Sequence, residues 1–340
     1  MRGKLTIYDI AKIAGVSPAT VSRVIHRADY VREGTKQKVW KAFDDAGITP
    51  DMLAFKPDSA KKISETNSRV PVILACIPAL NNPFYTDVLD GIIACTQDFG
   101  FKTIVCTEVP DNYHLEQFLE FCATLQIFGI ILCVRLSEDV LYKLSAVYPL
   151  VQCSDYNPIC KNIPYVNVDD YTVAREAVAW LARANCKKIG FFSAPRHFQF
   201  VQNRYRAYKT ALKEAGLKET PENVIMVADF SYERILAAAK TFFQTKKPPD
   251  GIFAVSDAHA HAIIKAAWEF GIKIPDDLKV IGFDNTMYAI LSTPTITTIS
   301  QPRRQLGMES ARLLLEMIKN PSEHPESVTL PTQILWRETT

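Results

Sequence analysis

The N-terminal residues best suited to chemistry are short hydroxyl side chains and one guanidinium, all within seven positions. They are Ser17, Thr20, Ser22 and Arg23. Hydroxyl groups donate hydrogen bonds to phosphate oxygens, and a guanidinium pairs in bidentate fashion with the edge of a guanine. This combination predicts contacts with double-stranded DNA.

Two short helices position these residues. Thr6 and Asp9 have the spacing of a capping box, and Gly15 can take the left-handed conformation that ends a helix. Ser17 is a favourable N-cap for a second helix, and Pro18 suits its first position. Apolar residues recur at helical spacing in both segments: Ile7, Ile10, Ala11, Ala14, Val21, Val24 and Ile25. Two helices joined by a glycine turn predict a helix-turn-helix, whose second helix enters the major groove.

The segments TIYDIAKIAGVSPATVSRVIH and VREGTKQKVWKAFDDAGITP closely resemble the headpiece of the lac repressor family, the LacI/GalR regulators. The resemblance is dense over the first fifty residues. It implies a homodimeric transcription regulator, expected to be a repressor, that binds near-palindromic double-stranded operator DNA and responds to a small metabolite. It implies base preference set by Pro18 and Ala19, with Arg23 reading guanine. The expected DNA-binding residues are Thr6, Ser17, Pro18, Ala19, Thr20, Ser22, Arg23, His26, Tyr30, Thr35, Leu53 and Ala54.

Charge and composition agree with a DNA-binding head on a globular body. Residues 1–62 hold 12 Lys and Arg against 7 Asp and Glu, a balance of +5, whereas the remaining residues hold 27 against 30, a balance of −3. No apolar run reaches the roughly 18 residues of a membrane helix, and the N-terminus lacks the apolar segment of a signal peptide. The eight cysteines are scattered without metal-ligand spacing, which favours reduced thiols. We expect a cytoplasmic protein that does not associate with membranes.

Motifs for catalysis or cofactor binding are missing from the sequence. It contains no glycine-rich phosphate loop, no G-x-S-x-G and no HExxH. His259 and His261 lie two residues apart, which is unsuitable for one helical face but possible for a strand, and no third ligand follows nearby. We therefore expect neither an enzyme nor a metal or cofactor site.

A third helix is predicted over residues 32–46, with Val39, Trp40 and Phe43 in the core of the head. Its lysines, Lys36, Lys38 and Lys41, are available to DNA phosphates. We divide the chain into a headpiece (1–50), a hinge or linker (51–71) and an effector-binding and dimerisation core (72–340).

The linker departs from the family pattern. The family inserts a leucine pair into the minor groove here, but Pro57 occupies the position of that leucine, and the segment is long and polar. Proline blocks extension of a short helix. Either a shifted hinge contacts DNA through Met52, Leu53 or Phe55, or the linker is a tether without a wedge.

From Val72 onward the sequence alternates between apolar strand-like runs and amphipathic helices. Four runs from VPVILACIP to PLVQCS form one set, and four from KKIGFFSA to KVIGFDN form another. This predicts an α/β core of two doubly wound parallel-sheet subdomains with a cleft between them. The resemblance implies the periplasmic-binding-protein type I fold, and we expect the chain to cross between subdomains near 165–172, 297–302 and 328–333.

Ligand residues are expected at the carboxyl ends of strands. The resemblance places an aromatic loop, a ligand-holding arginine that opens RYRAYKTAL, an aromatic stacking residue and a hydroxyl-binding aspartate in the cleft. Two positions depart from sugar-binding members, with Ser154 in place of Asp and Ser256 in place of Asn. Phe198 and Phe200 lie near the same mouth. The expected effector-binding residues are Asn82, Phe84, Tyr85, Ser154, Asp155, Arg204, Phe230, Ser256, Asp257 and Asp284.

These patterns predict a sequence-specific DNA-binding regulator whose effector is a sugar or sugar derivative. Additional aromatics near the cleft keep a nucleoside or nucleobase effector open. A cytoplasmic sugar-binding protein with an incidental helical head is the other alternative.

Overall fold

The computed structural model describes residues 7–16, 18–25, 31–46, 70–245, 248–321 and 325–340. The chain divides into two compact units, one of residues 1–70 with 97–101 and one of residues 71–96 with 102–340. Within the described ranges, no helix has both the length and the apolar character needed to span a bilayer.

The first unit contains three helices, α1 (Ile7–Ala14), α2 (Pro18–Ile25) and α3 (Glu33–Ala46). Gly15 has φ +65°, and the amide of Val16 donates to the carbonyl of Ala11 at 3.0 Å, so the predicted glycine stop of α1 is confirmed. The buried core of this unit consists of Ile10, Ala11, Val21, Val24, Val39, Ala42 and Phe43.

The prediction that Trp40 belongs to this core was wrong. Val39 and Phe43 occupy the buried stripe of α3 at i and i+4, which leaves Trp40 one position around the helix. Its side chain is 41% exposed, and its ring lies 5.7 Å from that of Phe43 between centroids.

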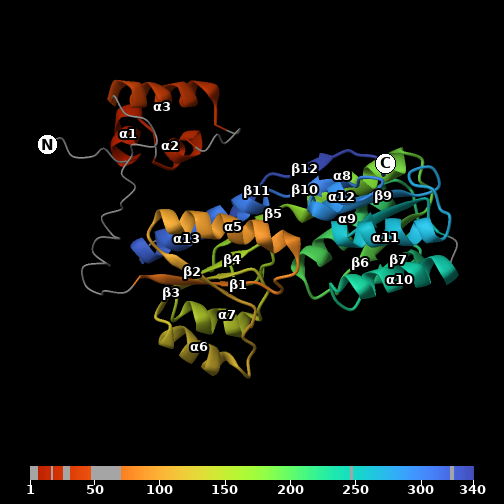
Figure 1. The fold of residues 1–340 in the computed structure, drawn as a ribbon, viewed down its shortest axis with the longest axis horizontal. Helices are drawn as coiled ribbons and strands as arrows, with labels where there is room; N and C mark the ends of the chain where they lie inside the picture. The colour runs from red at the N-terminus through yellow and green to blue at the C-terminus, as the bar shows by residue number, and fades with distance from the viewer. Residues whose placement is uncertain (1–6, 17, 26–30, 47–69, 246–247, 322–324) are drawn as a thin grey trace. The chain divides into compact units, whose positions relative to one another are not determined.

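The second unit contains two six-stranded sheets (Figure 1). The first has the order β11-β5-β4-β3-β1-β2 and is entirely parallel. Its strands are β1 (Val72–Cys76), β2 (Lys102–Cys106), β3 (Ile127–Leu132), β4 (Leu150–Cys153), β5 (Tyr165–Val168) and β11 (Val328–Leu330). Helices α5 (Pro83–Asp98) and α13 (Arg303–Lys319) cover one face, and α6 (Leu115–Thr124) and α7 (Glu138–Ser145) cover the other.

The second sheet has the order β12-β10-β9-β8-β6-β7, with only β12 antiparallel to its neighbour. Its strands are β6 (Ile189–Ser193), β7 (Val224–Met226), β8 (Gly251–Ala254), β9 (Lys279–Asp284), β10 (Thr297–Ser300) and β12 (Gln333–Leu335), and a 3-10 turn, η2 (Pro221–Asn223), precedes β7. Helices α8 (Asp170–Arg183) and α9 (Gln199–Glu214) pack on one face. On the other face lie α10 (Tyr232–Thr245) and α11 (Asp257–Glu269), and the short α12 (Met287–Leu291) contacts α11. The predicted fold class, a helical head plus two doubly wound parallel sheets, is confirmed.

The chain passes from one sheet to the other between β5 and α8, between β10 and α13, and between β11 and β12. Each sheet therefore contains strands from distant parts of the sequence. Helices α5 and α13 approach each other unusually closely. A Cβ on Gly307 would overlap the carbonyl oxygen of Val88, and a Cβ on Gly91 would overlap that of Arg304. Only glycine fits at this crossing.

Candidate functional site

The predicted DNA-reading helix is present as α2. Its inward-facing residues Val21 and Val24 are buried as expected. Thr20 on α2 and Thr35 on α3 are partly exposed. The side chains of Pro18, Ala19, Ser22 and Arg23 lie outside what the structure describes, as do the residues Thr6, Ser17, His26, Tyr30, Leu53 and Ala54 and the hinge with Pro57. The DNA contacts therefore remain predictions.

A cavity of about 650 Å³ lies at the carboxyl ends of strands from both sheets. Its walls come from the loop after β1, the start of α5, the residue after β4, and the segments that follow β6 to β10. Eight of the ten expected effector residues line it: Asn82, Phe84, Tyr85, Ser154, Arg204, Phe230, Ser256 and Asp284.

Arg204 is held rigidly at the cavity wall. It lies in the second turn of α9, which begins at Gln199. Its Nε donates to Asp170 Oδ1 at 2.8 Å, its Nη2 lies 2.7 Å from the same oxygen, and its Nη1 donates to the Val255 carbonyl at 2.6 Å. The guanidinium also lies over the Phe283 ring, 3.4 Å from the centroid. These contacts fix the orientation of its remaining N–H donors.

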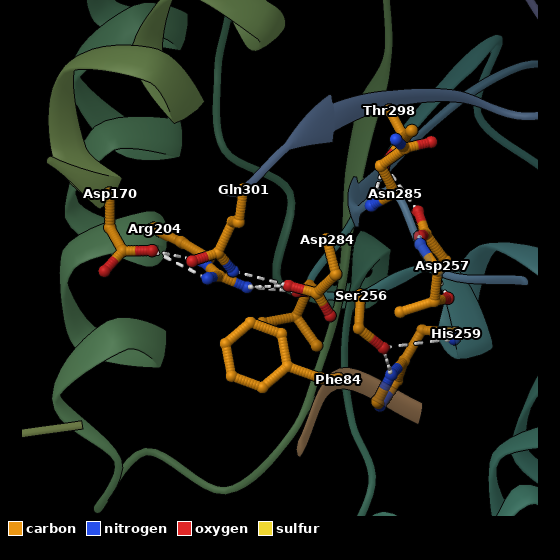
Figure 2. A network of polar contacts seen from close by, with 12 residues as sticks. Phe84, Asp170, Arg204, Ser256, Asp257, His259, Asp284, Asn285, Thr298 and Gln301 are labelled. Carbon is orange, nitrogen blue, oxygen red and sulfur yellow. Dashed lines mark hydrogen bonds and ion pairs between the residues drawn. The ribbon is translucent and has the colours of Figure 1, made fainter. Parts of the chain in front are cut away.

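Asp284 faces Arg204 from the end of β9. Its Oδ1 lies 3.9 Å from Arg204 Nη1 and accepts a hydrogen bond from Gln301 Nε2 at 2.7 Å. Figure 2 shows Arg204 between Asp170 on one side and Asp284 with Gln301 on the other. Burial raises the pKa of Asp284 to about 6, against the opposing effect of Arg204. Asp284 and Asn285 have φ of +106° and +55°, a strained conformation of the kind that concentrates at binding sites.

Two expected effector residues do not line the cavity. Asp155 is 1% exposed because its Oδ1 accepts the backbone N–H of Gln199 at 2.9 Å, at the start of α9. Burial raises the pKa of Asp155 to about 7. Its neighbour Ser154, with φ +68°, lines the cavity instead.

Asp257 is fully buried behind the wall. Its Oδ2 accepts from the amide of Thr286 at 2.6 Å, and its Oδ1 accepts from the hydroxyl of Thr298 at 2.5 Å. Burial and the neighbouring carboxylate of Asp284 raise the pKa of Asp257 to about 8. Asp257 therefore holds Thr286, which lines the cavity, and is not itself part of the lining.

His259 and His261 both lie on α11, not on a strand. His259 is buried, its Nδ1 lies 2.8 Å from the hydroxyl of Ser256, and burial lowers its pKa to about 3, so the ring is neutral. His261 Nδ1 lies 2.6 Å from the hydroxyl of Tyr232. Among the described residues, no group of three or more His, Cys, Asp or Glu could hold a metal ion.

Aromatic rings form much of the cavity wall. Phe198 and Phe200 on either side of the start of α9 pack against Phe230, with centroids 5.2 and 6.2 Å from it. Phe84 and Tyr85 contact each other edge to face at 5.1 Å. The aromatic residues in the lining are Phe84, Tyr85, Phe198, Phe200, Phe230, Tyr232 and Tyr288. The cavity thus combines flat apolar surfaces with a buried arginine–carboxylate pair.

Comparisons with known proteins agree with both parts of the fold. Residues 6–51 match the family model of bacterial regulatory proteins of the lacI family, and residues 178–340 match the periplasmic binding protein-like domain. The chain is 30% identical over 342 residues to the transcriptional regulator DegA of Bacillus subtilis (strain 168), covering 99% of this chain and 98% of DegA. The chain belongs to the LacI family. It is a DNA-binding transcriptional regulator.

Two further comparisons cover nearly the whole LacI-family chain. The transcriptional repressor CytR of Escherichia coli (strain K12) is 28% identical over 337 residues, covering 98% of this chain and 96% of CytR. The lac repressor dimer bound to operator and the anti-inducer ONPF has the same fold, with a TM-score of 0.71, 20% identity and coverage of 98% of both chains.

The site of this LacI-family protein includes residues that the sequence analysis missed. Asp170 anchors Arg204, Gln301 donates to Asp284, and Thr286 lines the cavity. Asp170 and Gln301 each follow a strand, so their positions could have been noticed. The sequence could not show that Asp170 pairs with Arg204 or that Gln301 pairs with Asp284, because these partners are 34 and 17 residues away along the chain.

Three side chains of the LacI-family core connect its two sheet-bearing halves beside the cavity. Asp155 accepts from Gln199, and Arg135 donates to the His197 carbonyl at 3.1 Å. Arg303, at the start of α13, donates to Asp87 on α5 at 2.8 Å and to the Asn285 carbonyl at 2.6 Å, and also contacts the Asp284 carbonyl. The conformation of the Asp284 loop is therefore tied directly to the first half.

Proposed function

We propose that this chain is a homodimeric repressor of transcription that binds near-palindromic operator DNA and is controlled by a sugar or sugar derivative in the 650 Å³ cavity. The observation that carries the effector class is the opposition of Arg204 and Asp284 between aromatic walls. A ring hydroxyl can accept from the guanidinium and donate to the carboxylate, while the apolar face of a sugar ring packs on an aromatic side chain.

The proposed effector residues are those of the predicted set that line the cavity, with Arg204, Asp284 and Phe230 central. Phe230 supplies an accessible ring, since it is 36% exposed, whereas Arg204 and Asp284 are buried and already oriented. Asp155 and Asp257 act behind them, by holding the start of α9 and Thr286. Preorganisation of this kind lowers the entropic cost of binding.

A nucleoside or nucleobase is the second candidate for the effector. Seven aromatic residues in the lining favour it, because a planar base can stack on such rings. The two classes share the hydroxyl-binding pair but differ in their need for stacking.

The proposed switch follows from the contacts between the two halves of the core. A ligand that touches both halves favours the closure state in which its contacts are best satisfied, and shifts the equilibrium only by that preference. The Arg303 bridge from Asp87 to the Asp284 loop transmits a change at the ligand to the first half. We propose that this movement changes the separation of the two DNA-reading heads in the dimer.

The dimer is supported by the surface of α12. Met287, Ile290 and Leu291 are all more than half exposed on this five-residue helix. Apolar side chains grouped in this way are typical of protein interfaces. In the proposed dimer, each α2 reads one half-site from the major groove, with Arg23 at guanine and Pro18 and Ala19 against thymine methyl groups.

A thermal-shift screen with sugars, sugar phosphates, nucleosides and nucleobases tests the effector class. A ligand at about 100 times its dissociation constant adds roughly 2.7 kcal/mol to the free energy of unfolding. Phe230→Ala should weaken the response, whereas Phe121→Ala, an exposed ring on α6 outside the cavity, should not. The proposed site is contradicted if no sugar, sugar phosphate, nucleoside or nucleobase stabilises the protein. It is also contradicted if Phe230→Ala and Phe121→Ala show equal thermal shifts with the ligand.

Deletion of residues 1–62 tests the division of labour. The truncated chain should lose binding to an operator selected from a random duplex library and keep its thermal response to the ligand found in the screen. Retained operator binding would rule out the head as the DNA-binding unit. Failure of the full-length chain to select any operator from the library would instead favour the alternative of a sugar-binding protein with an incidental head.

A further inference from the structure

A row of thiols crosses the carboxyl edge of the first sheet. The four neighbouring strands β4, β3, β1 and β2 each carry a cysteine at their end or one residue beyond it. These residues are Cys153, Cys133, Cys76 and Cys106 in that order. All four are free thiols, and all but Cys106 are buried.

Cys76 and Cys106 occupy directly paired positions on two adjacent strands. They are Cα partners in the register of β1 and β2, and both side chains pack into the same apolar cluster on one face of the first sheet. Adjacent strands lie about 4.7–4.9 Å apart, which falls within the roughly 4.4–6.8 Å Cα separation of disulfides. The Cα spacing of this pair is therefore compatible with a disulfide.

The two thiols differ in accessibility and in acidity. Cys106 is half-buried, whereas Cys76 is fully buried against α6 and α7. The neighbouring Cys76 thiol lowers the pKa of Cys106 to about 6, whereas Cys106 and burial raise the pKa of Cys76 well above its usual value. In the reduced form the Cys106 thiol donates to the Glu108 carbonyl at 3.4 Å. Cys106 is thus the accessible nucleophile, and Cys76 is the protonated partner beside it.

We propose that Cys76 and Cys106 form a peroxide-sensitive dithiol whose oxidation to a disulfide regulates the loop that lines the cavity. The Cys106 thiolate attacks one oxygen of a hydroperoxide, forms an S–O bond and releases hydroxide or alkoxide. The Cys76 sulfur then attacks the resulting sulfenic acid, and the S–S bond forms as water leaves. Two electrons pass from the thiols to the peroxide, and a thiol reductant reverses the change.

The position of the pair connects it to ligand binding. Cys76 ends β1, and the cavity-lining loop begins two residues later at Pro78. The amide of Ile77 donates to the Cys106 carbonyl at 3.0 Å, so the start of this loop already pairs with the end of β2. A covalent bond at Cys76 therefore restrains the loop that carries Asn82 and leads into Phe84.

Titration of the full-length protein with hydrogen peroxide, followed by tandem mass spectrometry, tests the proposal. Two of the eight thiols should disappear first, in a Cys76–Cys106 disulfide that dithiothreitol reverses. In the reduced protein, Cys106 should react with iodoacetamide about tenfold faster than the buried cysteines. A first disulfide that joins other cysteines, or direct over-oxidation of Cys106 without a disulfide, overturns the proposal.

Variants separate the roles of the two sulfurs. Cys76→Ser should trap the sulfenic acid of Cys106, detected as a dimedone adduct, whereas Cys106→Ser should abolish the rapid reaction. Cys186→Ser, a buried thiol of the second sheet's core, is the matched control and should behave as wild type. The wild-type mass mapping remains decisive where a variant does not fold.

Hydrogen exchange of reduced and oxidised wild-type protein tests the regulatory part. Amides of residues 77–85 should exchange more slowly after oxidation, because the disulfide restrains both strand ends. Unchanged exchange in that segment, in protein shown to carry the Cys76–Cys106 bond, overturns the link to the cavity. This outcome is independent of the identity of the effector.

Discussion

Arg204 Nη1 lies 3.9 Å from Asp284 Oδ1 across the cavity wall, while the other edge of the same guanidinium is bound to Asp170. One cation is thus shared between a structural carboxylate and a carboxylate that lines the cavity. Arg204 and its two carboxylate partners are all buried, so this arrangement affects folding and binding together.

Removal of the Arg204 side chain should cost stability as well as ligand binding. Arg204→Ala leaves the buried carboxyl of Asp170 without its partner, and we expect a loss of about 3–5 kcal/mol in the free energy of unfolding. Arg175→Ala, which breaks an exposed pair with Glu214, should cost less than about 1 kcal/mol. Urea unfolding of both variants measures the contrast, and similar losses would show that the buried pair is not structural.

The crossing of α5 and α13 should not tolerate a methyl group. Gly307→Ala places a Cβ against the Val88 carbonyl, and the helices must separate, at a cost of about 1–3 kcal/mol. Gly34→Ala on α3 has nothing within 4 Å of the new Cβ and should be neutral or stabilising by up to about 1 kcal/mol. Thermal unfolding monitored by circular dichroism distinguishes the two.

The buried carboxyls should make stability depend on pH. The folded-state pKa values of Asp284, Asp155 and Asp257 are raised to about 6, 7 and 8, above their ordinary value of 3.8. The folded chain therefore holds protons that the unfolded chain has lost, and the free energy of unfolding should fall as pH rises from about 4 to 8. The urea midpoint measured at each pH tests this expectation.

Asp257→Asn isolates the largest of these contributions. Its amide oxygen can accept from Thr286, and its NH₂ can donate to the hydroxyl of Thr298, so the neutral side chain keeps the contacts. The decline in stability towards pH 8 should become shallower in this variant. A pH profile parallel to that of the wild type would show that Asp257 does not titrate in this range.

DNA recognition should separate into base reading and phosphate contact. Arg23→Ala should cost roughly 1–3 kcal/mol of operator affinity and relax the preference at one base pair. Lys38→Ala, on the exposed side of α3, should weaken binding uniformly across sequences and reduce its salt dependence. Binding to a set of single-base operator variants at several salt concentrations provides the measurement. Equal selectivity in wild type and Arg23→Ala would contradict guanine reading.

Local patterns in the sequence were sufficient to predict the helices of the head and the type of the core. Gly15 ends α1, and Val21 and Val24 are buried, because caps and periodicity act within a few residues. The strand runs of the core likewise alternate with helices as predicted, since their apolar patterns are local. The same reasoning placed Arg204, Phe230 and Asp284 at one cavity, given the resemblance to a known family.

Contacts between segments far apart in the sequence determine which of these side chains line the cavity and which lie behind them. Asp155 turns to the start of α9, Asp257 turns to Thr286 and Thr298, and Arg204 selects Asp170 as its anchor. Trp40 likewise leaves the core because the stripe of α3 already contains Val39 and Phe43. These arrangements depend on hydrogen bonds and packing between segments far apart in the chain. A polar group can be buried at low cost in free energy only when a hydrogen-bond partner from another segment is present.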